Sequence, residues 1–206
     1  MPDTASVDRG FRARRSTSRG LDSQQRILTA AVELFAKQGY HATSITDIGE
    51  HAQVKRGALY YYINSKEELL FSVLVQHVEA VLERAVATSA SDLAPVAKLH
   101  RLLHDHVHLL MERKDDLTIY ERDRHALTGE RFAELRELQA RVEQVWKETI
   151  DEGIADGAFR PIDPVVLKGI IGMAISLHHW FDQRGRLTTD QIADHLYEFV
   201  MDGVRT

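Results

Sequence analysis

The chain has 206 residues, of which 44% are hydrophobic and 28% charged, and it contains no cysteine. This length supports one large domain or two small ones, and the lack of cysteine excludes disulfides, thiolate metal sites and thiol catalysis. The net charge of -5 is unevenly distributed: residues 1–66 carry 10 Lys and Arg against 6 Asp and Glu, and residues 67–206 carry 16 against 25. The positive first third suits a polyanionic partner.

Composition also predicts the fold class and the compartment. Only 4 prolines and long runs rich in Ala, Leu, Glu and Arg favour an all-α protein of about nine helices. The first twenty residues hold no apolar stretch of signal-peptide length. The most apolar segment, 165–181, is interrupted by Lys168, His178 and His179 and is shorter than the roughly 20 residues that cross a bilayer. We therefore expect a cytoplasmic protein with no membrane partner.

Residues 1–21 are predicted to form a disordered basic arm. An arm of this composition can lie along phosphates or reach into a minor groove, and a merely solubilising tail explains it equally well. Its arginines are Arg9, Arg12, Arg14, Arg15 and Arg19. The first helix is expected to start after the arm, with Asp22 or Ser23 as its cap, and to end at Gly39.

Residues 22–67 are predicted to form a DNA-binding domain. After the first helix, Thr43 and Ser44 offer caps for a short helix, and a turn at Gln53 and Val54 separates it from a second one. Two short helices joined by so tight a turn form a helix-turn-helix, whose second helix can enter a DNA major groove. A helical subdomain with a basic solvated face is the alternative.

The exposed face of the second short helix has the chemistry of a DNA contact. It combines cations, a glycine that permits close backbone approach, and phenols that can donate to phosphate. Arg56 is the best candidate for a bidentate contact to guanine, and Lys66 is expected to clamp a phosphate at the start of the next helix. The residues predicted to contact double-stranded DNA are Ser44, Thr46, Lys55, Arg56, Gly57, Ala58, Tyr60, Tyr61 and Lys66.

Residues 68–206 are predicted to form a ligand-binding and dimerisation domain. One helix-turn-helix reads only a few base pairs, so specific binding normally needs two copies at a fixed spacing and therefore a homodimer. The last two helices are the predicted interface, because they are apolar and one has small residues that permit close approach. The interface residues are Val166, Ile170, Met173, Ala174, Leu177, Phe181, Ile192, Leu196, Phe199 and Val200. An intrachain core is the alternative.

The middle helices offer apolar wall and polar anchors for a small-molecule effector. The candidate residues are Leu103, His106, Val107, Leu110, Tyr120, Arg124, Trp146, His178 and Trp180. Each of them is also explained by ordinary packing, because apolar stripes on helices usually form core. No cofactor is expected.

A histidine stripe supports a second functional hypothesis. His100, His104 and His108 recur every four residues and share one helix face, a geometry that can hold a divalent metal. A hydrated stripe explains them as well, because three side chains on one helix rarely converge on one ion without a partner. No HExxH, P-loop or GxSxG motif occurs, so we expect no enzyme. A helical metal-binding protein or metal-sensing regulator is the alternative function.

Motifs along residues 27–74 occur in an order typical of one family. Phe35 precedes the Gly39-Tyr40 pair, and the run GALYYYINSKEEL follows from Gly57 without a gap. This stretch resembles the N-terminal domain of TetR-family transcriptional regulators. The resemblance implies that residues 44–63 read operator DNA in a homodimeric repressor that a small molecule releases. Two departures are Gln53, where the family usually has glycine, and Lys55, where it often has a small hydroxyl residue.

The remainder of the chain is similar to one branch of that family. Residues 100–132, the run DEGIADGAFR and residues 176–204 resemble TetR-type repressors that sense acyl-CoA thioesters in fatty-acid or steroid catabolism. The resemblance implies an acyl-CoA effector. Where the branch often has Tyr-Arg before a tryptophan, this chain has His178-His179 and thus lacks a cation for a phosphate.

Overall fold

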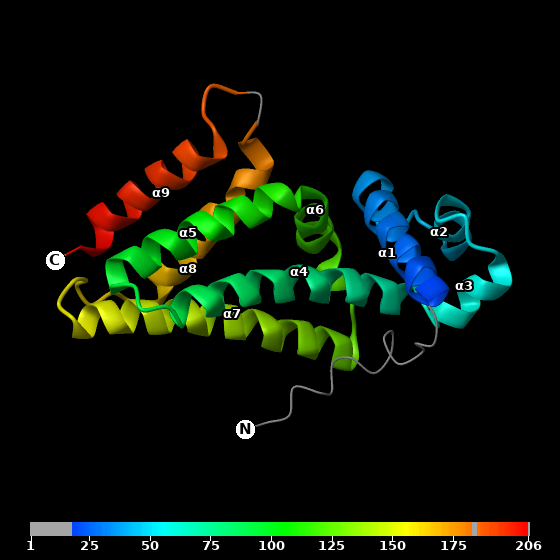
Figure 1. The fold of residues 1–206 in the computed structure, drawn as a ribbon, viewed down its shortest axis with the longest axis horizontal. Helices are drawn as coiled ribbons and strands as arrows, with labels where there is room; N and C mark the ends of the chain where they lie inside the picture. Colours follow the sequence, from blue (N-terminus) through cyan, green and yellow to red (C-terminus); the bar gives the residue numbers. More distant parts are fainter. Residues whose placement is uncertain (1–17, 183–184, 206) are drawn as a thin grey trace. The chain divides into compact units, whose positions relative to one another are not determined.

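The computed structural model describes residues 18–182 and 185–205. Within these ranges the protein is formed by nine α-helices and one 3-10 turn, which confirms the predicted all-α class (Figure 1). The chain divides into two compact units, the first formed by residues up to 76 with 118–135 and the second by 77–117 with 136–206. The predicted domain boundary at residue 67 stays a prediction, and α4 (Lys66–Ser89) continues through it.

In the first unit, α1 (Ser18–Gln38) begins earlier than predicted and ends where predicted. Asp22 does not cap the helix but lies within it and pairs with Arg26 at 3.4 Å. The helix thus replaces the end of the arm predicted for residues 1–21, and residues 1–17 lie outside the described part of the chain. Gly39 ends the helix because its φ of 89° favours a residue without a Cβ.

The helix-turn-helix is formed by α2 (Ile45–His51) and α3 (Arg56–Tyr62). Ser44 caps α2 in a capping box: its hydroxyl accepts from the backbone N–H of Asp47, whose carboxylate accepts from the Ser44 N–H. The turn contains Gln53 at φ 53°, which confirms that a left-handed residue is needed where the sequence has no glycine.

The rest of the first unit consists of the start of α4, the end of α6 (Lys114–Asp123), the 3-10 turn η1 (Arg124–Ala126) and the start of α7 (Gly129–Ala155). Glu67 of α4 joins these segments, since its carboxylate accepts from the Thr128 N–H at 3.0 Å and pairs with Arg131 at 3.4 Å. The buried core around them includes Ile27, Phe35, Ile48, Leu59, Ile63 and Leu70.

The second unit is a bundle in which α5 (Pro95–Glu112) packs against α8 (Pro164–Trp180) and α9 (Thr189–Val204) (Figure 1). Pro95 and Pro164 each stand in the first turn of a helix, where the missing N–H costs nothing. The remainder of α4 and α7 completes the unit. Its core includes Leu99, Leu103, Trp146, Ala174 and Leu177.

The loop after α7 is fixed to the end of α9. Gly153 has room for no side chain, because a Cβ there would lie 2.1 Å from the ring of Phe159. Phe159 forms an isolated bridge with Arg205, and the Arg160 N–H donates to the Val204 carbonyl at 2.9 Å. The tie holds the C-terminal end of α9 in place. Of the helices that the structure describes, none is long and apolar enough to span a membrane.

Candidate nucleic-acid interface and effector cavity

The predicted DNA contacts other than Lys66 are exposed residues at the start of α2 and along α3. Lys55 is the N-cap of α3, and the helix presents Arg56, Gly57 and Ala58 to solvent. Tyr60 and Tyr61 are about half exposed, at 49% and 53%. Thr46 and the capping residue Ser44 are exposed at the start of α2. These residues are thus accessible to a partner, and their contact with DNA stays a prediction.

Close packing of the two short helices sets the position of these exposed residues. Leu59 of α3 is buried against α2, and a Cβ at Gly49 would lie 2.6 Å from its Cδ2 atom. A side chain at Gly49 would therefore push α3 away from α2. Gly49 is a residue that the sequence analysis missed, because a glycine in a short helix gives no sign of what it packs against.

The chemistry of α3 suits a DNA groove. The Arg56 guanidinium lies 5.9 Å from the centroid of the Tyr60 ring, a cation–π distance that orients the cation on the exposed face. Nothing lies within 4 Å of a Cβ built at Gly57, so the backbone is open there to close approach. An oriented guanidinium beside an open backbone can approach a base edge and the neighbouring phosphates together.

Lys66 has a different role from the predicted one. Its ammonium donates to the carbonyl oxygens of Tyr40 at 2.8 Å, Thr43 at 2.9 Å and His41 at 3.4 Å, and it lies 4.4 Å from the centroid of the Tyr40 ring. These bonds use all three protons of an ammonium. Lys66 closes the turn between α1 and α2 onto α4, and this corrects its assignment as a phosphate clamp.

The end of α6 holds the end of α1. The Arg122 guanidinium donates to the carbonyl oxygens of Phe35 and Ala36 in the last turn of α1. Asp123, only 5% exposed, accepts from Arg122 and from the Tyr40 N–H at 3.2 Å. The sequence analysis missed this contact, because the residues that it joins are more than eighty positions apart.

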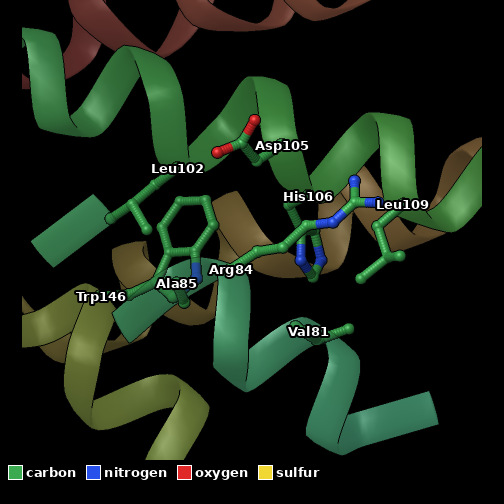
Figure 2. Close-up of a pocket in the computed structure, with 8 residues that line it drawn as sticks. All are labelled: Val81, Arg84, Ala85, Leu102, Asp105, His106, Leu109 and Trp146. Carbon is green, nitrogen blue, oxygen red and sulfur yellow. The ribbon is translucent and has the colours of Figure 1, made fainter. Parts of the chain in front are cut away.

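The second unit contains a small cavity that includes part of the predicted effector site (Figure 2). It is lined from α4, α5 and α7 by Val81, Arg84, Ala85, Leu102, Asp105, His106, Leu109 and Trp146. Its volume is about 10 Å³, which is room for one water molecule. The buried His106 Nε2 and Trp146 Nε1 atoms have no hydrogen-bond partner among the described residues. Such orphaned donors and acceptors are costly, so the cavity is suited to a polar occupant.

Burial keeps the imidazoles near this cavity neutral. Desolvation lowers the pKa of His106 from 6.5 to about 4. Desolvation, then the nearby His106 and Arg113, lowers the pKa of His77 on α4 to about 4 as well. His106 packs edge to face on Trp146, with 5.7 Å between ring centroids. A neutral imidazole can donate or accept a hydrogen bond, as a polar ligand requires.

The other predicted effector residues are dispersed. Leu103, Val107 and Leu110 are buried in the second unit but do not line this cavity, where Leu102 and Leu109 stand instead. Tyr120 and Arg124 belong to the first unit, where the guanidinium lies 5.2 Å from the Tyr120 ring centroid and pairs with Glu121 at 2.8 Å. The structure therefore brings His106 and Trp146 together and leaves these five elsewhere.

The two candidates at the end of α8 stand apart from the cavity. His178 is hydrogen-bonded through Nδ1 to the Ile175 carbonyl, and its ring contacts that of His179 at a tilt of 42°. Trp180 is 60% exposed, so it is not the wall of an interior pocket that its apolar ring suggested. Apolar character alone did not separate an exposed terminal residue from a buried one.

The predicted dimer surface is reduced by the structure. Six of the ten predicted residues are buried within the chain, which corrects their assignment, since helical periodicity marks an apolar face without saying what covers it. They are Ile170, Ala174, Leu177, Phe181, Ile192 and Val200. Phe199 is 70% and Val166 38% exposed, and Met173 and Leu196 are half-buried. A groove between α8 and α9 is lined by Val166, Gly169, Ile170, Met173, Phe199, Val200, Asp202, Gly203 and Val204.

The three histidines of the stripe all face α9. His104 and His108 both contact Asp190, at 3.3 and 2.8 Å, whereas His100 pairs with Asp194 at 3.4 Å. The structure thus brings two of the three candidates onto one carboxylate, that of Asp190. The spacing of the histidines could not identify α9, the helix that carries it.

These features define a helix-turn-helix DNA-binding protein with a separate helical unit. Residues 27–73 match the model of the bacterial regulatory proteins of the tetR family, and residues 92–204, more than half of the chain, match that of a tetracyclin repressor-like C-terminal domain. The chain belongs to the TetR family of transcriptional regulators. Its matched relatives are named as transcriptional regulators rather than enzymes.

Relatives and solved structures of the family resemble the chain along most of its length. The HTH-type transcriptional repressor KstR2 of Rhodococcus jostii is 28% identical over 181 residues, which cover 86% of this chain and 89% of the relative. The structure of AibR in complex with isovaleryl coenzyme A and operator DNA is similar with a TM-score of 0.76 and 28% identity, over 85% of this chain and 96% of that one. A tetR-family regulatory protein from Rhodococcus RHA1 has the same fold, with a TM-score of 0.83, 24% identity and coverage of 92% and 98%.

Proposed function

We propose that the protein is a homodimeric repressor that leaves its operator when an acyl-CoA thioester binds to the second unit. The exposed face of α3, held in place by Gly49 and Leu59, carries this proposal because it joins a cation and an open backbone on a helix-turn-helix. Arg56 reads a base, and Lys55, Thr46 and the two exposed tyrosines contact the backbone of the DNA. Repression is supported by the relative named KstR2, a transcriptional repressor.

The occupant of the groove between α8 and α9 is a second copy of the chain. Phe199 is more exposed than any other large apolar residue described, and Val166 stands on the facing helix. Exposing such a side chain beside an apolar groove is costly unless another surface covers it. A dimer also supplies the second reading head that one helix-turn-helix needs for specific binding.

The effector is a small acyl-CoA thioester that enters the cavity beside His106 and Trp146. The solved relative AibR was crystallised with isovaleryl coenzyme A, and it supports this chemical class. Arg84 lines the cavity and keeps its guanidinium at the surface, 40% exposed and 2.7 Å from Glu112, where it can pair with a phosphate. The cavity must widen from the size of one water, so the ligand selects an open form of the unit.

Helices that follow one another along the chain transmit the effect of the ligand to the DNA-binding helices. α5 lines the cavity and is followed directly by α6, which runs from the second unit into the first and ends at Arg122 and Asp123. These two residues hold the end of α1. A ligand that binds the open form more tightly therefore shifts the population towards dimers whose two reading heads have a different separation. The affinity for DNA falls by the ratio of the ligand's affinities for the two forms.

The experiment is binding of the purified protein to the DNA upstream of its own gene, over a salt series and with a panel of acyl-CoA thioesters. We expect tight binding that weakens steeply with salt, and release by one thioester of the panel. In the variant Arg84→Gln release should need at least about tenfold more thioester, because a charge-assisted contact to phosphate is lost. The matched control Arg101→Gln, on the same unit but outside the cavity, should respond like the wild type.

Each part of the proposal fails separately. Binding that no thioester disturbs would remove the acyl-CoA effector and leave the repressor. Absence of sequence-preferring binding to that DNA or to genomic fragments would overturn the repressor itself. A chain that sediments as a monomer at micromolar concentration, or a Phe199→Asp variant with the wild-type oligomeric state, would remove the proposed interface.

A further inference from the structure

A ladder of histidines and aspartates joins α5 to α9. Along α5, His100 contacts Asp194, and His104 and His108 contact Asp190. The order of these pairs shows that the two helices run antiparallel. These contacts are ion pairs only when the imidazoles are protonated. The ladder lies where α5 packs against α9.

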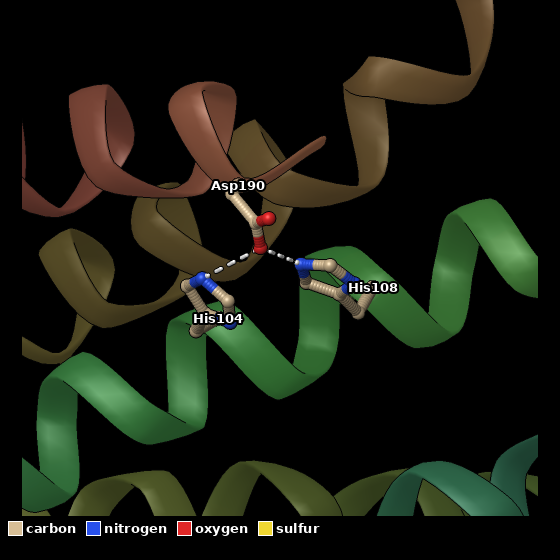
Figure 3. Close-up of side chains that lie close together, drawn as sticks. All are labelled: His104, His108 and Asp190. Atoms are coloured by element: carbon tan, nitrogen blue, oxygen red, sulfur yellow. Dashed lines mark hydrogen bonds and ion pairs between the residues drawn. The ribbon is translucent and has the colours of Figure 1, made fainter. Parts of the chain in front are cut away.

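Three of these side chains converge on one point (Figure 3). The Nε2 atom of His104 lies 3.3 Å and that of His108 2.8 Å from the same oxygen, Oδ1 of Asp190. One ligand atom from each residue lies within 4.8 Å of the others. The two rings are nearly parallel, with 22° between their planes and 4.6 Å between centroids, so both present their Nε2 edges towards α9.

We propose that His104, His108 and Asp190 form a binding site for a divalent transition-metal ion of the zinc class. Ligand atoms at about 2.1 Å from a tetrahedral ion lie about 3.4 Å apart, so small rotations of the side chains suffice to admit the ion. Histidines four residues apart supply two ligands from one helix turn, and the carboxylate of the other helix supplies the third. A water molecule completes the fourth position.

The donor set determines the kind of ion. Imidazole nitrogen suits Zn²⁺, Co²⁺, Ni²⁺ and Cu²⁺, whereas Mg²⁺ and Ca²⁺ prefer a set of oxygen ligands. The site is also accessible, because the side chains of His104 and His108 are 29% and 30% exposed and that of Asp190 65%. An ion can enter from solvent while packing keeps the two imidazoles close to their binding orientation.

The ion would pin the first turn of α9 to the middle of α5. Asp190 is the second residue of α9, directly after the capping residue Thr188 and Thr189. His100 and Asp194 lie one turn further along the ladder and support the same junction from outside the trio. Metal binding should therefore be visible as a higher unfolding temperature of the whole chain, since the ion binds the folded form.

The test uses the full chain without a histidine tag, treated with a chelator and then titrated with Zn²⁺ in a calorimeter and with Co²⁺ in a spectrophotometer. We expect one ion per chain, a visible absorption of tetrahedral Co²⁺ that Zn²⁺ abolishes, and a metal-dependent rise in the unfolding temperature. These measurements need no DNA, so their outcome is independent of the proposed function.

Matched variants locate the ion. Asp190→Asn and His108→Ala should each weaken Zn²⁺ binding by about 100-fold and cancel the rise in unfolding temperature. His195→Ala removes an exposed histidine of α9 outside the trio and should bind like the wild type. Circular dichroism without metal establishes that each variant folds, and His104→Gln replaces any that does not. Substoichiometric or millimolar binding, or equal losses in His195→Ala, would overturn the proposal.

Discussion

A polar network in the first unit and a cavity in the second differ in how their polar groups are hydrogen-bonded. In the first unit, the buried Asp123 accepts hydrogen bonds from two partners and the Lys66 ammonium donates three. In the second, His106 Nε2 and Trp146 Nε1 are buried beside a cavity without a described partner. A network in which every polar group is hydrogen-bonded favours one conformation, as a surface that reads DNA requires. Buried atoms without a hydrogen-bond partner instead favour a ligand that supplies one.

The change with the largest expected effect on stability is at Asp123. The change Asp123→Ala leaves the Tyr40 N–H without its partner and removes the carboxylate that orients Arg122. We expect the free energy of unfolding to fall by about 3 kcal/mol, because breaking a buried charge network strands the remaining groups. Urea unfolding at fixed protein concentration measures the loss. Asp115→Ala, an exposed residue of the same helix, is the control, and an equal effect in both variants would contradict the role given to Asp123.

The second unit should weaken in acid through His77. Its folded pKa of about 4 lies below the usual 6.5, so the unfolded chain binds a proton first as the pH falls. Stability from this group is complete above about pH 6.5 and is lost progressively towards pH 4, by about 3 kcal/mol at most. His77→Leu should show a smaller acid loss than the wild type in urea unfolding with chelator present. The control His125→Gln, which changes an exposed histidine, should keep the full loss of stability in acid. If His77→Leu keeps it as well, another group causes that loss.

The first unit was the more predictable from sequence, because its signals are local. The cap at Ser44, the end of α1 at Gly39 and the strained turn at Gln53 each depend on residues within a few positions of one another. The contacts that the sequence did not indicate, such as Asp123 with Tyr40, join residues far apart in the chain. Pattern alone identifies a face and never names what lies against it.

In the second unit the same limit has larger consequences. Apolar periodicity could not separate the buried Leu177 from the exposed Phe199, and so the predicted dimer surface included both. The histidine spacing predicted one shared face correctly, whereas its partner Asp190 stands on another helix. Residues of the cavity beside His106 were predicted only in part, since the contact between His106 and Trp146 joins two helices that the sequence pattern does not pair.

Arg56 tests whether the exposed face of α3 reads bases. The change Arg56→Ala removes the guanidinium that lies over Tyr60. We expect discrimination at one base pair of the operator to fall by about 1–3 kcal/mol, because a bidentate contact to guanine is lost. Binding to an operator and to its single-base variants gives the value. Loss of affinity that is equal for every sequence would instead assign Arg56 to phosphate contact.

Lys66 separates a structural cation from a DNA-binding one. Lys66→Ala removes three hydrogen bonds to carbonyl oxygens, and we expect the free energy of unfolding to fall by about 1.5 kcal/mol. The salt dependence of DNA binding should keep its slope, because no phosphate contact is removed. The slope of Lys55→Ala should decrease by about one, which makes it the comparison. A reduced slope in Lys66→Ala would restore the phosphate contact that the sequence suggested.

The smallest effect is expected at Gln53, where the backbone of the first unit is strained. Its φ of 53° is costly for a residue with a Cβ, so Gln53→Gly should raise the free energy of unfolding by about 1 kcal/mol. The exposed Gln53 side chain makes no hydrogen bond to another described residue, and Gln53→Ala keeps the Cβ and should stay near the wild type. The unfolding temperature decides between them. If Gln53→Gly stabilises the unit and leaves operator affinity unchanged, the backbone strain contributes nothing to DNA binding. If operator affinity falls, the stiffness of the turn is needed to hold α3 in the orientation that contacts DNA.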